Sequence, residues 1–311
     1  MSFIAEFDLI EQIKRQCDTT TAGTVLGIGD DAAILQPNPD CQLTVSTDTL
    51  VAGVHFKETD QAIHIGHKAL AVNLSDMAAM GATPKWVLLN LTLPDINRKW
   101  INGFIKGFAA LLAKYQVQLI GGDTTQGPLS IAVTVMGETS NAIRRDGANL
   151  HDLVVVTGEI GSAAFALHNP RRSKACNQQL KQPEPRLDVA KNITHLATAM
   201  IDVSDGLMVD LGHICRASNL AAVIELSQVP INSIIQKDKN WMAYVLAGGD
   251  DYQLCFTINA EAEDELPEDC HIIGQIIEPP NKESDVVMVL HHHQPITTNF
   301  KGYQHFDDEK R

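Results

Sequence analysis

The spacing of apolar and polar residues along the chain follows two periods, one typical of helices and one typical of strands. Over residues 98–115 apolar residues recur every three or four positions, which predicts a helix with one buried face. Over residues 129–135 they alternate with smaller residues, which predicts a half-buried strand. The same patterns predict further helices at 3–16, 61–80, 186–198 and 239–247 and one from residue 207, and strands at 43–51, 86–93, 119–120, 153–156, 221–226 and 252–258 and one ending at Asp202.

Helices and strands interleave in both halves of the 311-residue chain, which predicts an α/β or α+β fold with about two domains. The density of apolar residues drops around residues 140–152, where a polar connector separates two predicted strands. We therefore expect an N-terminal domain at 1–140 and a C-terminal domain at 150–306. Residues 169–185 contain three prolines and are predicted to form a loop.

The chain is acidic, with 24 Lys and Arg residues against 38 Asp and Glu residues and a net charge of −14. Such a surface repels nucleic acid and anionic membranes, so neither is predicted as a partner. We expect no signal peptide, and no run of about 18 apolar residues predicts a membrane span. The six cysteines form no C-x-x-C pair, so we expect reduced thiols in a cytoplasmic protein.

The positions of the aspartates suggest that their carboxylates have a chemical role. Most of them lie in or beside turns rich in glycine or small residues, where Asp is also a common structural residue. Asp76 differs, because it lies inside a predicted apolar helix and its charge must be paired, solvated or bound to a metal there. The aspartates in such turns are Asp30, Asp31, Asp48, Asp123, Asp202, Asp205, Asp250 and Asp251.

If several of these carboxylates converge, their mutual repulsion requires divalent cations, and oxygen ligands of this kind suit Mg²⁺. Mg²⁺ held by carboxylates commonly binds substrate phosphates too, so an acidic protein could bind a triphosphate through shared metals. The chain has no P-loop and no protein-kinase catalytic loop. Residues 291–293 are three consecutive histidines beside a predicted turn, and we expect a solvated loop there rather than a metal site.

Seven short motifs, taken together and in order, resemble the thiamine-monophosphate kinase family of the aminoimidazole ribonucleotide synthetase-like superfamily. The similarity extends from about residue 6 to residues 302–306, which is nearly the whole chain. The motifs are Gly-Ile-Gly-Asp-Asp at 27–31, Ser-Thr-Asp at 46–48, His-Phe at 55–56, Asn-Leu-Ser-Asp at 73–76 with Gly81, Ala82 and Pro84, Gly-Gly-Asp-Thr at 121–124, Asp-Val-Ser-Asp-Gly-Leu at 202–207 and Gly-Gly-Asp-Asp-Tyr at 248–252.

The resemblance implies a two-domain fold, with an N-terminal α/β domain that forms a β-barrel across a homodimer and a C-terminal α+β domain. It implies transfer of the ATP γ-phosphate to thiamine phosphate, which yields thiamine diphosphate and ADP, with the help of several Mg²⁺ ions. The metal ligands that it implies are Asp30, Ser46, Thr47, Asp48, Asp76, Asp123, Asp202 and Asp205. The ATP-binding residues are Phe104, Gly122, Asp123, Arg145 and Ser204, and the residues for thiamine phosphate are His55, Asp250 and Tyr303. The family usually has Glu where this chain has Asp250, and often Trp where it has Tyr303.

No catalytic side chain is required by this chemistry. The attacking group is a phosphate oxygen that is already ionised at neutral pH, so catalysis rests on positioning and on the neutralisation of charge. Two alternatives stay open at this point. One is another ATP-dependent synthetase of the same superfamily, and the other is a non-enzymatic acidic module that binds cations.

Overall fold

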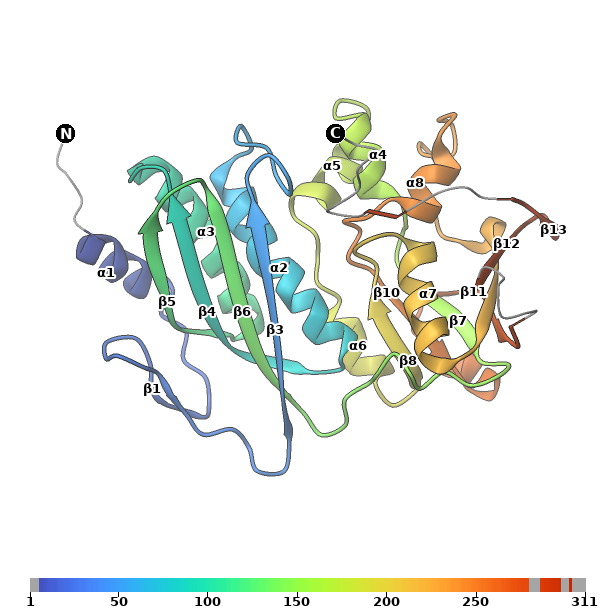
Figure 1. Cartoon of the computed structure of the whole chain (residues 1–311), viewed down its shortest axis with the longest axis horizontal. Coiled ribbons are helices and arrows are strands. Elements are labelled where there is room, and N and C mark those ends of the chain that lie inside the picture. The colour runs from blue at the N-terminus through green and yellow to red at the C-terminus, as the bar shows by residue number, and fades with distance from the viewer. Residues whose placement is uncertain (1–5, 280–285, 298–301, 304–311) are drawn as a thin grey trace. The chain divides into compact units, whose positions relative to one another are not determined.

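The computed structural model describes residues 6–279, 286–297 and 302–303, and these residues form two compact units (Figure 1). The first unit contains the described residues up to residue 77 together with 82–142. The second contains residues 78–81 and the described residues from 143 onward. No helix in these described ranges combines the length and the apolar character that a membrane crossing requires.

The first unit is built on a four-stranded sheet in the order β3-β6-β4-β5, with β4 and β5 parallel and the other pairs antiparallel. Its two long helices, α2 and α3, lie on one side of this sheet (Figure 1). The elements are α1 (Glu6–Gln16), β1 (Thr24–Leu26), β2 (Ile34–Leu35), β3 (Gln42–Val51), α2 (Ala62–Ala79), β4 (Thr83–Leu93), α3 (Arg98–Tyr115), β5 (Gln118–Gln126) and β6 (Ser130–Thr139).

Strand β6 shows how one face of this sheet is covered. Its residues alternate between buried and half-buried positions, and Ile131, Val133 and Val135 are completely buried. This is the alternation expected of a strand with one face against a core. Among the described strands the sheet stays open, with β3 and β5 as its edges, so the chain by itself forms no closed barrel.

The second unit contains a seven-stranded sheet in the order β13-β12-β9-β11-β7-β10-β8. Strands β9 and β12 are parallel and the other neighbours are antiparallel, which gives an α+β arrangement. The strands are β7 (Leu153–Thr157), β8 (Ala197–Asp202), β9 (Ala221–Glu225), β10 (Leu254–Ile258), β11 (Cys270–Ile277), β12 (Val287–His291) and β13 (Gln294–Pro295). The helices are α4 (Ser162–His168), α5 (Lys174–Lys181), α6 (Leu187–Ile193), α7 (Leu207–Ser218) and α8 (Trp241–Ala247), with short 3₁₀ turns at Leu226–Gln228 and Ala260–Glu265.

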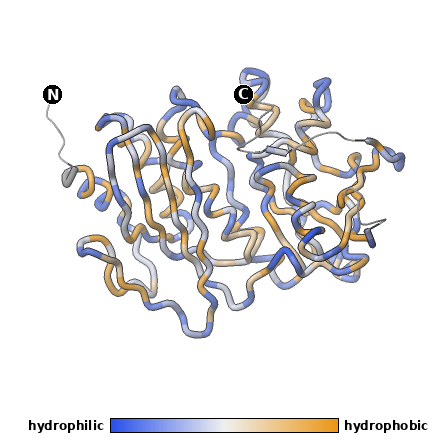
Figure 2. Tube along the Cα trace, viewed as in Figure 1, coloured by the Kyte–Doolittle hydropathy of each residue, from blue (hydrophilic) through white to orange (hydrophobic). Residues whose placement is uncertain are grey.

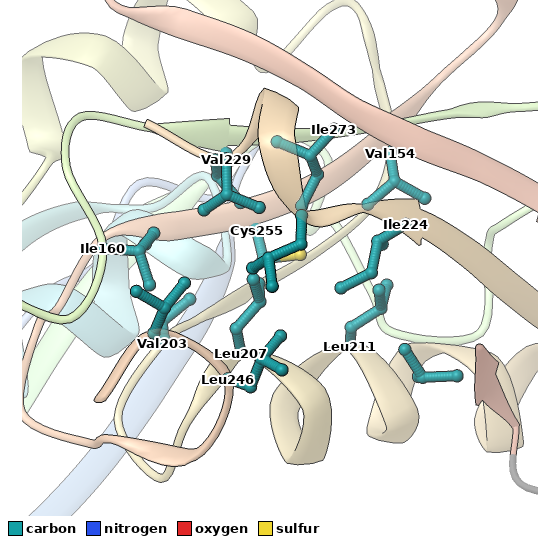
Figure 3. Close-up of a cluster of buried hydrophobic side chains, with 14 of the residues drawn as sticks. Val154, Ile160, Val203, Leu207, Leu211, Ile224, Val229, Leu246, Cys255 and Ile273 are labelled. Atoms are coloured by element: carbon teal, nitrogen blue, oxygen red, sulfur yellow. The ribbon is translucent and has the colours of Figure 1, made fainter. Parts of the chain in front are cut away.

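Helix α7 closes the core of the second unit against the sheet. Figure 3 shows Leu207 and Leu211 of this helix pointing toward Ile224 and Cys255 of the sheet. All four side chains are completely buried. In Figure 2 the hydrophobic stretches follow the strands of both units, and the hydrophilic stretches gather in the connecting loops. The apolar residues therefore form the core between the strands and helices, and the polar residues that could bind ligands lie mainly in the loops.

Two predicted features differ from the structure. The strand expected at 119–120 does not end at the glycine pair, because β5 continues to Gln126 and places Asp123 inside the sheet. The stretch 169–185 is not entirely a loop, since it contains α5, whose first turn is capped by the Ser173 side chain. In both places residues typical of turns lie within or directly beside a regular element.

Candidate active site

Strand β3 and helix α2 bring three of the predicted metal ligands together. The Ser46 hydroxyl donates a hydrogen bond of 2.5 Å to Oδ2 of Asp76. Asp48 lies two residues farther along the same face of the strand, where its backbone N–H donates to Oδ1 of Asn73 at 3.1 Å. Asn73 is completely buried and donates in turn to the carbonyl of Ala69 at 3.0 Å. Side chains from one face of β3 and one face of α2 thus form a cluster of oxygen atoms.

The charge balance in this cluster favours a cation. Burial, and after it the negative charge of Asp76, raise the pKa of Asp48 to about 6. The residues present supply only carboxylate and hydroxyl oxygen atoms, and this donor set fits a hard divalent cation such as Mg²⁺. Within the described part of the chain, no three His, Cys, Asp or Glu residues are arranged so that they alone could hold a metal ion.

Thr47 and Asp123 belong to the other face of the same sheet. The Thr47 hydroxyl donates to the carbonyl of Val133 at 3.1 Å and lies 3.0 Å from the Thr134 hydroxyl. Asp123 pairs with Asn90 in the ladder between β5 and β4, and both residues are exposed. Because successive residues of a strand point to opposite faces, these side chains are separated by the sheet from the cluster of Ser46, Asp48 and Asp76.

The glycine before Asp123 has a structural reason to be glycine. Gly122 has a φ of +148°, and a Cβ there would lie 1.8 Å from the carbonyl oxygen of Leu89. Any other residue would therefore collide with strand β4. Gly122 is exposed on its open side, so its backbone can be approached closely by a ligand.

Asp30 and His55 lie in turns of the first unit. Asp30 is exposed in the turn between β1 and β2, and its Oδ1 accepts the backbone N–H of Asp31 at 2.8 Å. His55 follows β3, and its Nδ1 accepts the backbone N–H of Val51 at 2.9 Å. A neutral ring that accepts at Nδ1 carries its proton on Nε2. His55 can therefore act as a hydrogen-bond donor toward a ligand.

Phe104 lies in the interior of the first unit. Its side chain is completely buried in α3, stacked between the rings of Trp100 and Phe108 with centroid distances of 5.3 and 5.8 Å. The apolar stripe that predicted this helix already includes Phe104 as a core position. Phe104 therefore belongs to the core of the first unit, and its contact with ATP stays a prediction.

Two loops of the second unit are joined by backbone hydrogen bonds. The N–H of Asp250 donates to the carbonyl of Ser204 at 2.9 Å, and the N–H of Tyr252 donates to the carbonyl of Val203 at 2.9 Å. The N–H of Tyr303 donates to the carbonyl of Asp205 at 3.1 Å. Residues 202–206, 248–252 and 303 are therefore neighbours, although the chain separates them widely. Five predicted residues are brought together in this way, namely Asp202, Ser204, Asp205, Asp250 and Tyr303.

Asp210 holds the first of these loops and was not predicted as a site residue. Its Oδ2 accepts the backbone N–H groups of Ser204, Asp205 and Gly206 at 3.1, 3.0 and 3.0 Å. Burial raises the pKa of Asp210 to about 7, against the effect of these hydrogen bonds, which lower it. The available signal was an acidic residue in the first turn of the helix predicted from residue 207.

Asp251 holds the second loop. It is completely buried at the N-terminus of α4, where its Oδ2 accepts the N–H of Gly161 at 2.6 Å and its Oδ1 accepts the N–H of Ala163 at 3.0 Å. Burial raises its pKa to about 7. Of the two adjacent acids, only Asp250 is partly exposed, and its Oδ1 accepts a hydrogen bond of 2.9 Å from the Tyr252 hydroxyl.

Arg145 is exposed at the start of the second unit, and its carbonyl accepts the Ser218 hydroxyl at 3.1 Å. Its charge acts on His213 of α7, a residue that the sequence analysis did not single out. The pKa of His213 is lowered by burial and then by the positive charges of Arg216 and Arg145, while the charge of Asp205 raises it. The charges of Arg145 and Asp205 therefore both act on the His213 imidazole, with opposite effects on its pKa.

Comparisons with known proteins identify the family of the chain. The family described as AIR synthase related protein, N-terminal domain, matches residues 29–139, and its C-terminal domain counterpart matches residues 151–287. A thiamine-monophosphate kinase of Haemophilus influenzae is 38% identical over 99% of this chain and 99% of its own length.

Two solved structures are similar along nearly the whole chain. The crystal structure of thiamine-monophosphate kinase from Stenotrophomonas maltophilia K279a is 40% identical, with a TM-score of 0.82 over 92% of this chain and 96% of that one. AaThiL complexed with AMPPCP and TMP is 30% identical, with a TM-score of 0.76 over 98% of this chain and 99% of that one. The two AIR synthase related domains and this identity across the full length establish that the chain belongs to the thiamine-monophosphate kinase family.

Proposed function

We propose that the protein transfers the γ-phosphate of ATP to thiamine phosphate and forms thiamine diphosphate and ADP. The observation that carries this conclusion is the 38% identity with a thiamine-monophosphate kinase over 99% of both chains. A relative that is 30% identical is known in complex with AMPPCP and TMP, an ATP analogue and the acceptor. ATP is accordingly the co-substrate and thiamine phosphate the acceptor.

The chemistry asks for positioning and charge neutralisation rather than for a general base. The attacking oxygen belongs to a phosphate monoester, whose second pKa is near 6, so it is ionised at neutral pH. Both reactants are anionic and the chain itself carries a net charge of −14. Bound Mg²⁺ would orient the phosphate groups and offset their charge. The side chains of the protein then hold the ions and align the two substrates.

Metal ligands are proposed separately in each unit. Ser46, Asp48 and Asp76 are already assembled between β3 and α2, and the raised pKa of Asp48 fits a site that is completed by a cation. The remaining proposed ligands are Asp30, Thr47, Asp123, Asp202 and Asp205. Asp202 is buried at the end of β8, beside the loop that carries Asp205, and this supports its assignment.

The substrate residues follow from the same resemblance, now with chemical roles. We assign Gly122, Asp123, Arg145 and Ser204 to ATP. We assign His55, Asp250 and Tyr303 to thiamine phosphate. The Nε2–H of His55 suits an anionic or carbonyl-like acceptor, since its Nδ1 is occupied by the Val51 N–H. The Asp250 carboxylate suits the positively charged thiazolium ring or the amino group of the pyrimidine.

A homodimer is proposed from the open sheet of the first unit. Strand β3 is an edge strand, and its exposed residues include Leu43, Val45 and Val51, with exposed fractions of 48%, 59% and 36%. An apolar edge of this kind invites pairing with another chain. Two copies related by a two-fold axis would cover these residues and could close the two open sheets into one barrel. Sedimentation that finds an active monomer at micromolar concentration would exclude this arrangement.

We place the reaction in the cytoplasm, where ATP and thiamine phosphate are available. All six cysteines are free of disulfide bonds, and Cys17, Cys176, Cys215 and Cys255 are buried. Burial raises the pKa of the Cys17 thiol to about 12, so this residue is expected to stay an unreactive thiol.

The test is a direct assay. Purified protein is incubated with Mg-ATP and thiamine phosphate, and thiamine diphosphate and ADP are quantified by chromatography. The proposal requires the two products in equal amounts, and it requires the Asp48→Asn variant to be strongly impaired. ATP consumption without thiamine diphosphate would favour another synthetase of the superfamily. Metal binding without ATP consumption would favour a non-enzymatic cation-binding module.

A further inference from the structure

We propose that Tyr252 is a positioning residue for thiamine phosphate, because its hydroxyl fixes the Asp250 carboxylate in the orientation that the substrate meets. This inference rests on the proposed function and adds a residue to its acceptor site. Tyr252 is the last residue of the Gly-Gly-Asp-Asp-Tyr motif. Its hydroxyl donates a hydrogen bond of 2.9 Å to Oδ1 of Asp250.

The backbone around this hydrogen bond is unusual. Asp250 has a φ of +69° and Tyr252 a φ of +50°, so two residues with side chains, one of them aromatic, occupy the left-handed region within three positions. An aromatic residue rarely adopts this conformation. Such strain persists only where the surrounding structure enforces it, and it is concentrated at functional sites.

Hydrogen bonds on both sides hold the loop at 248–252 in this conformation. The residue between Asp250 and Tyr252 and the residue after them point inward. Asp251 binds the N-terminus of α4, and Gln253 accepts hydrogen bonds from Thr157 at 2.9 Å and Arg186 at 2.6 Å. Both are buried, whereas Asp250 and Tyr252 are partly exposed. Asp250 and Tyr252 also donate their backbone N–H groups to the loop at 202–206. The loop is therefore pinned on both sides, and its two outward side chains are turned toward each other.

The preceding glycine makes this arrangement possible. A Cβ at Gly249 would lie 2.3 Å from the carbonyl oxygen of Ser204, so only glycine lets the loop at 248–252 approach the loop at 202–206 this closely. The short side chain of Asp250 then ends within reach of the Tyr252 hydroxyl. A hydrogen bond to one oxygen fixes the orientation of the carboxylate, so its second oxygen has a defined position. This suits recognition of a fixed cation such as a thiazolium ring.

The test is a double-mutant cycle on Tyr252→Phe and Asp250→Ala in the steady-state kinase assay. Removal of the hydroxyl should raise KM for thiamine phosphate about three- to tenfold, the effect of one ordinary hydrogen bond. KM for ATP should not change. In the Asp250→Ala background, Tyr252→Phe should have no further effect, because its acceptor is gone. Tyr244→Phe removes a hydroxyl that accepts a hydrogen bond of 3.4 Å from Asn169 and keeps the Tyr252–Asp250 hydrogen bond, so it serves as the control with unchanged KM values.

Equal effects of Tyr252→Phe on the two KM values would overturn the proposal, as would the same loss in the Asp250→Ala background. These results would mean that the hydroxyl supports the fold rather than the substrate. If Tyr252→Phe does not fold, Asp250→Ala still decides, since an unchanged KM for thiamine phosphate in that variant would leave Tyr252 nothing to position. A wild-type protein that makes no thiamine diphosphate would instead refute the proposed function.

Discussion

The hydroxyl of Ser46 donates to the carboxylate of Asp76 at 2.5 Å, and this hydrogen bond joins the edge strand β3 to helix α2. A hydroxyl that donates its only proton keeps two lone pairs, so Ser46 can hold Asp76 and bind a cation at the same time. Asp48, on the same face of the strand, adds a second carboxylate. The strand and the helix therefore prepare an anionic site before any cation arrives.

The first prediction concerns the effect of the Asp48 charge on the stability of the metal-free protein. The pKa of Asp48 is raised to about 6 by burial and by Asp76, so the folded protein holds this proton more tightly than the unfolded chain does. The contribution of Asp48 to the free energy of unfolding of the metal-free protein is then largest below about pH 4 and is lost as the pH rises through 6. At about pH 7.5, Asp48→Asn should raise the free energy of unfolding by roughly 1–3 kcal/mol, with little difference near pH 4.

Urea unfolding in the presence of a chelator measures this effect at the two pH values. Asp123→Asn is the matched control, because Asp123 is exposed on the other face of the sheet and its replacement should change stability little. A less stable Asp48→Asn protein at about pH 7.5 would show that the carboxylate is structural and would weaken its assignment as a metal ligand.

The second prediction concerns removal of the metal. A protein with a net charge of −14 and an anionic site should bind ATP only together with Mg²⁺. Calorimetric titration with ATP should show saturable binding in excess Mg²⁺ and none in excess chelator, while circular dichroism stays the same. Tight ATP binding in the chelator would contradict the assignment of the carboxylates to metal.

Where a local pattern is strong, the fold could be predicted from the sequence. Helix α3 occupies the predicted range 98–115, because its apolar stripe is long and Asn97 caps its first turn. Strand β5 was predicted too short, because Gly121 and Gly122 are typical of turns. In the structure the backbone of β5 passes so close to the Leu89 carbonyl that only glycine fits at position 122. Local propensity does not predict such a contact between two strands.

The same limit applies to the site. The motifs identified Asp250, but the roles of Asp210 and Asp251 depend on backbone N–H groups, and those bound by Asp251 are about ninety residues away in the chain. Phe104, which the resemblance assigns to ATP, is a core residue by its own helical spacing. Tertiary contacts determine the roles of Asp210 and Asp251, and composition and spacing do not reveal those contacts.

The third prediction concerns Gly122. Gly122→Ala places a Cβ 1.8 Å from the Leu89 carbonyl on a backbone with φ of +148°, so the strand must shift. We expect a loss of about 2 kcal/mol or more in the free energy of unfolding and a higher KM for ATP. Gly121→Ala is the control, since its Cβ would meet only the flexible end of Leu88 at 3.1 Å. Equal stability of the two variants, by urea unfolding, would refute the close approach.

The last prediction separates the two adjacent acids of the loop at 248–252. Asp251 is buried and accepts the N–H groups of Gly161 and Ala163, so Asp251→Ala leaves buried donors without an acceptor. The free energy of unfolding should fall by roughly 2–4 kcal/mol. Asp250 is partly exposed, so Asp250→Asn should leave stability nearly unchanged. It should instead raise KM for thiamine phosphate about ten- to a hundredfold, the worth of a charge-assisted hydrogen bond, and barely change KM for ATP.

Urea unfolding and steady-state kinetics on both variants distinguish the two roles. Asp251→Ala should lower the free energy of unfolding, whereas Asp250→Asn should raise KM for thiamine phosphate and leave stability nearly unchanged. If Asp250→Asn weakens ATP and thiamine phosphate alike, Asp250 does not face the thiazolium ring or the aminopyrimidine. If Asp251→Ala keeps its stability and loses affinity for thiamine phosphate, the two acids have exchanged roles. The buried hydrogen bonds of Asp251 to the start of α4 are the reason to expect neither result, since a side chain bound there cannot also turn toward a substrate.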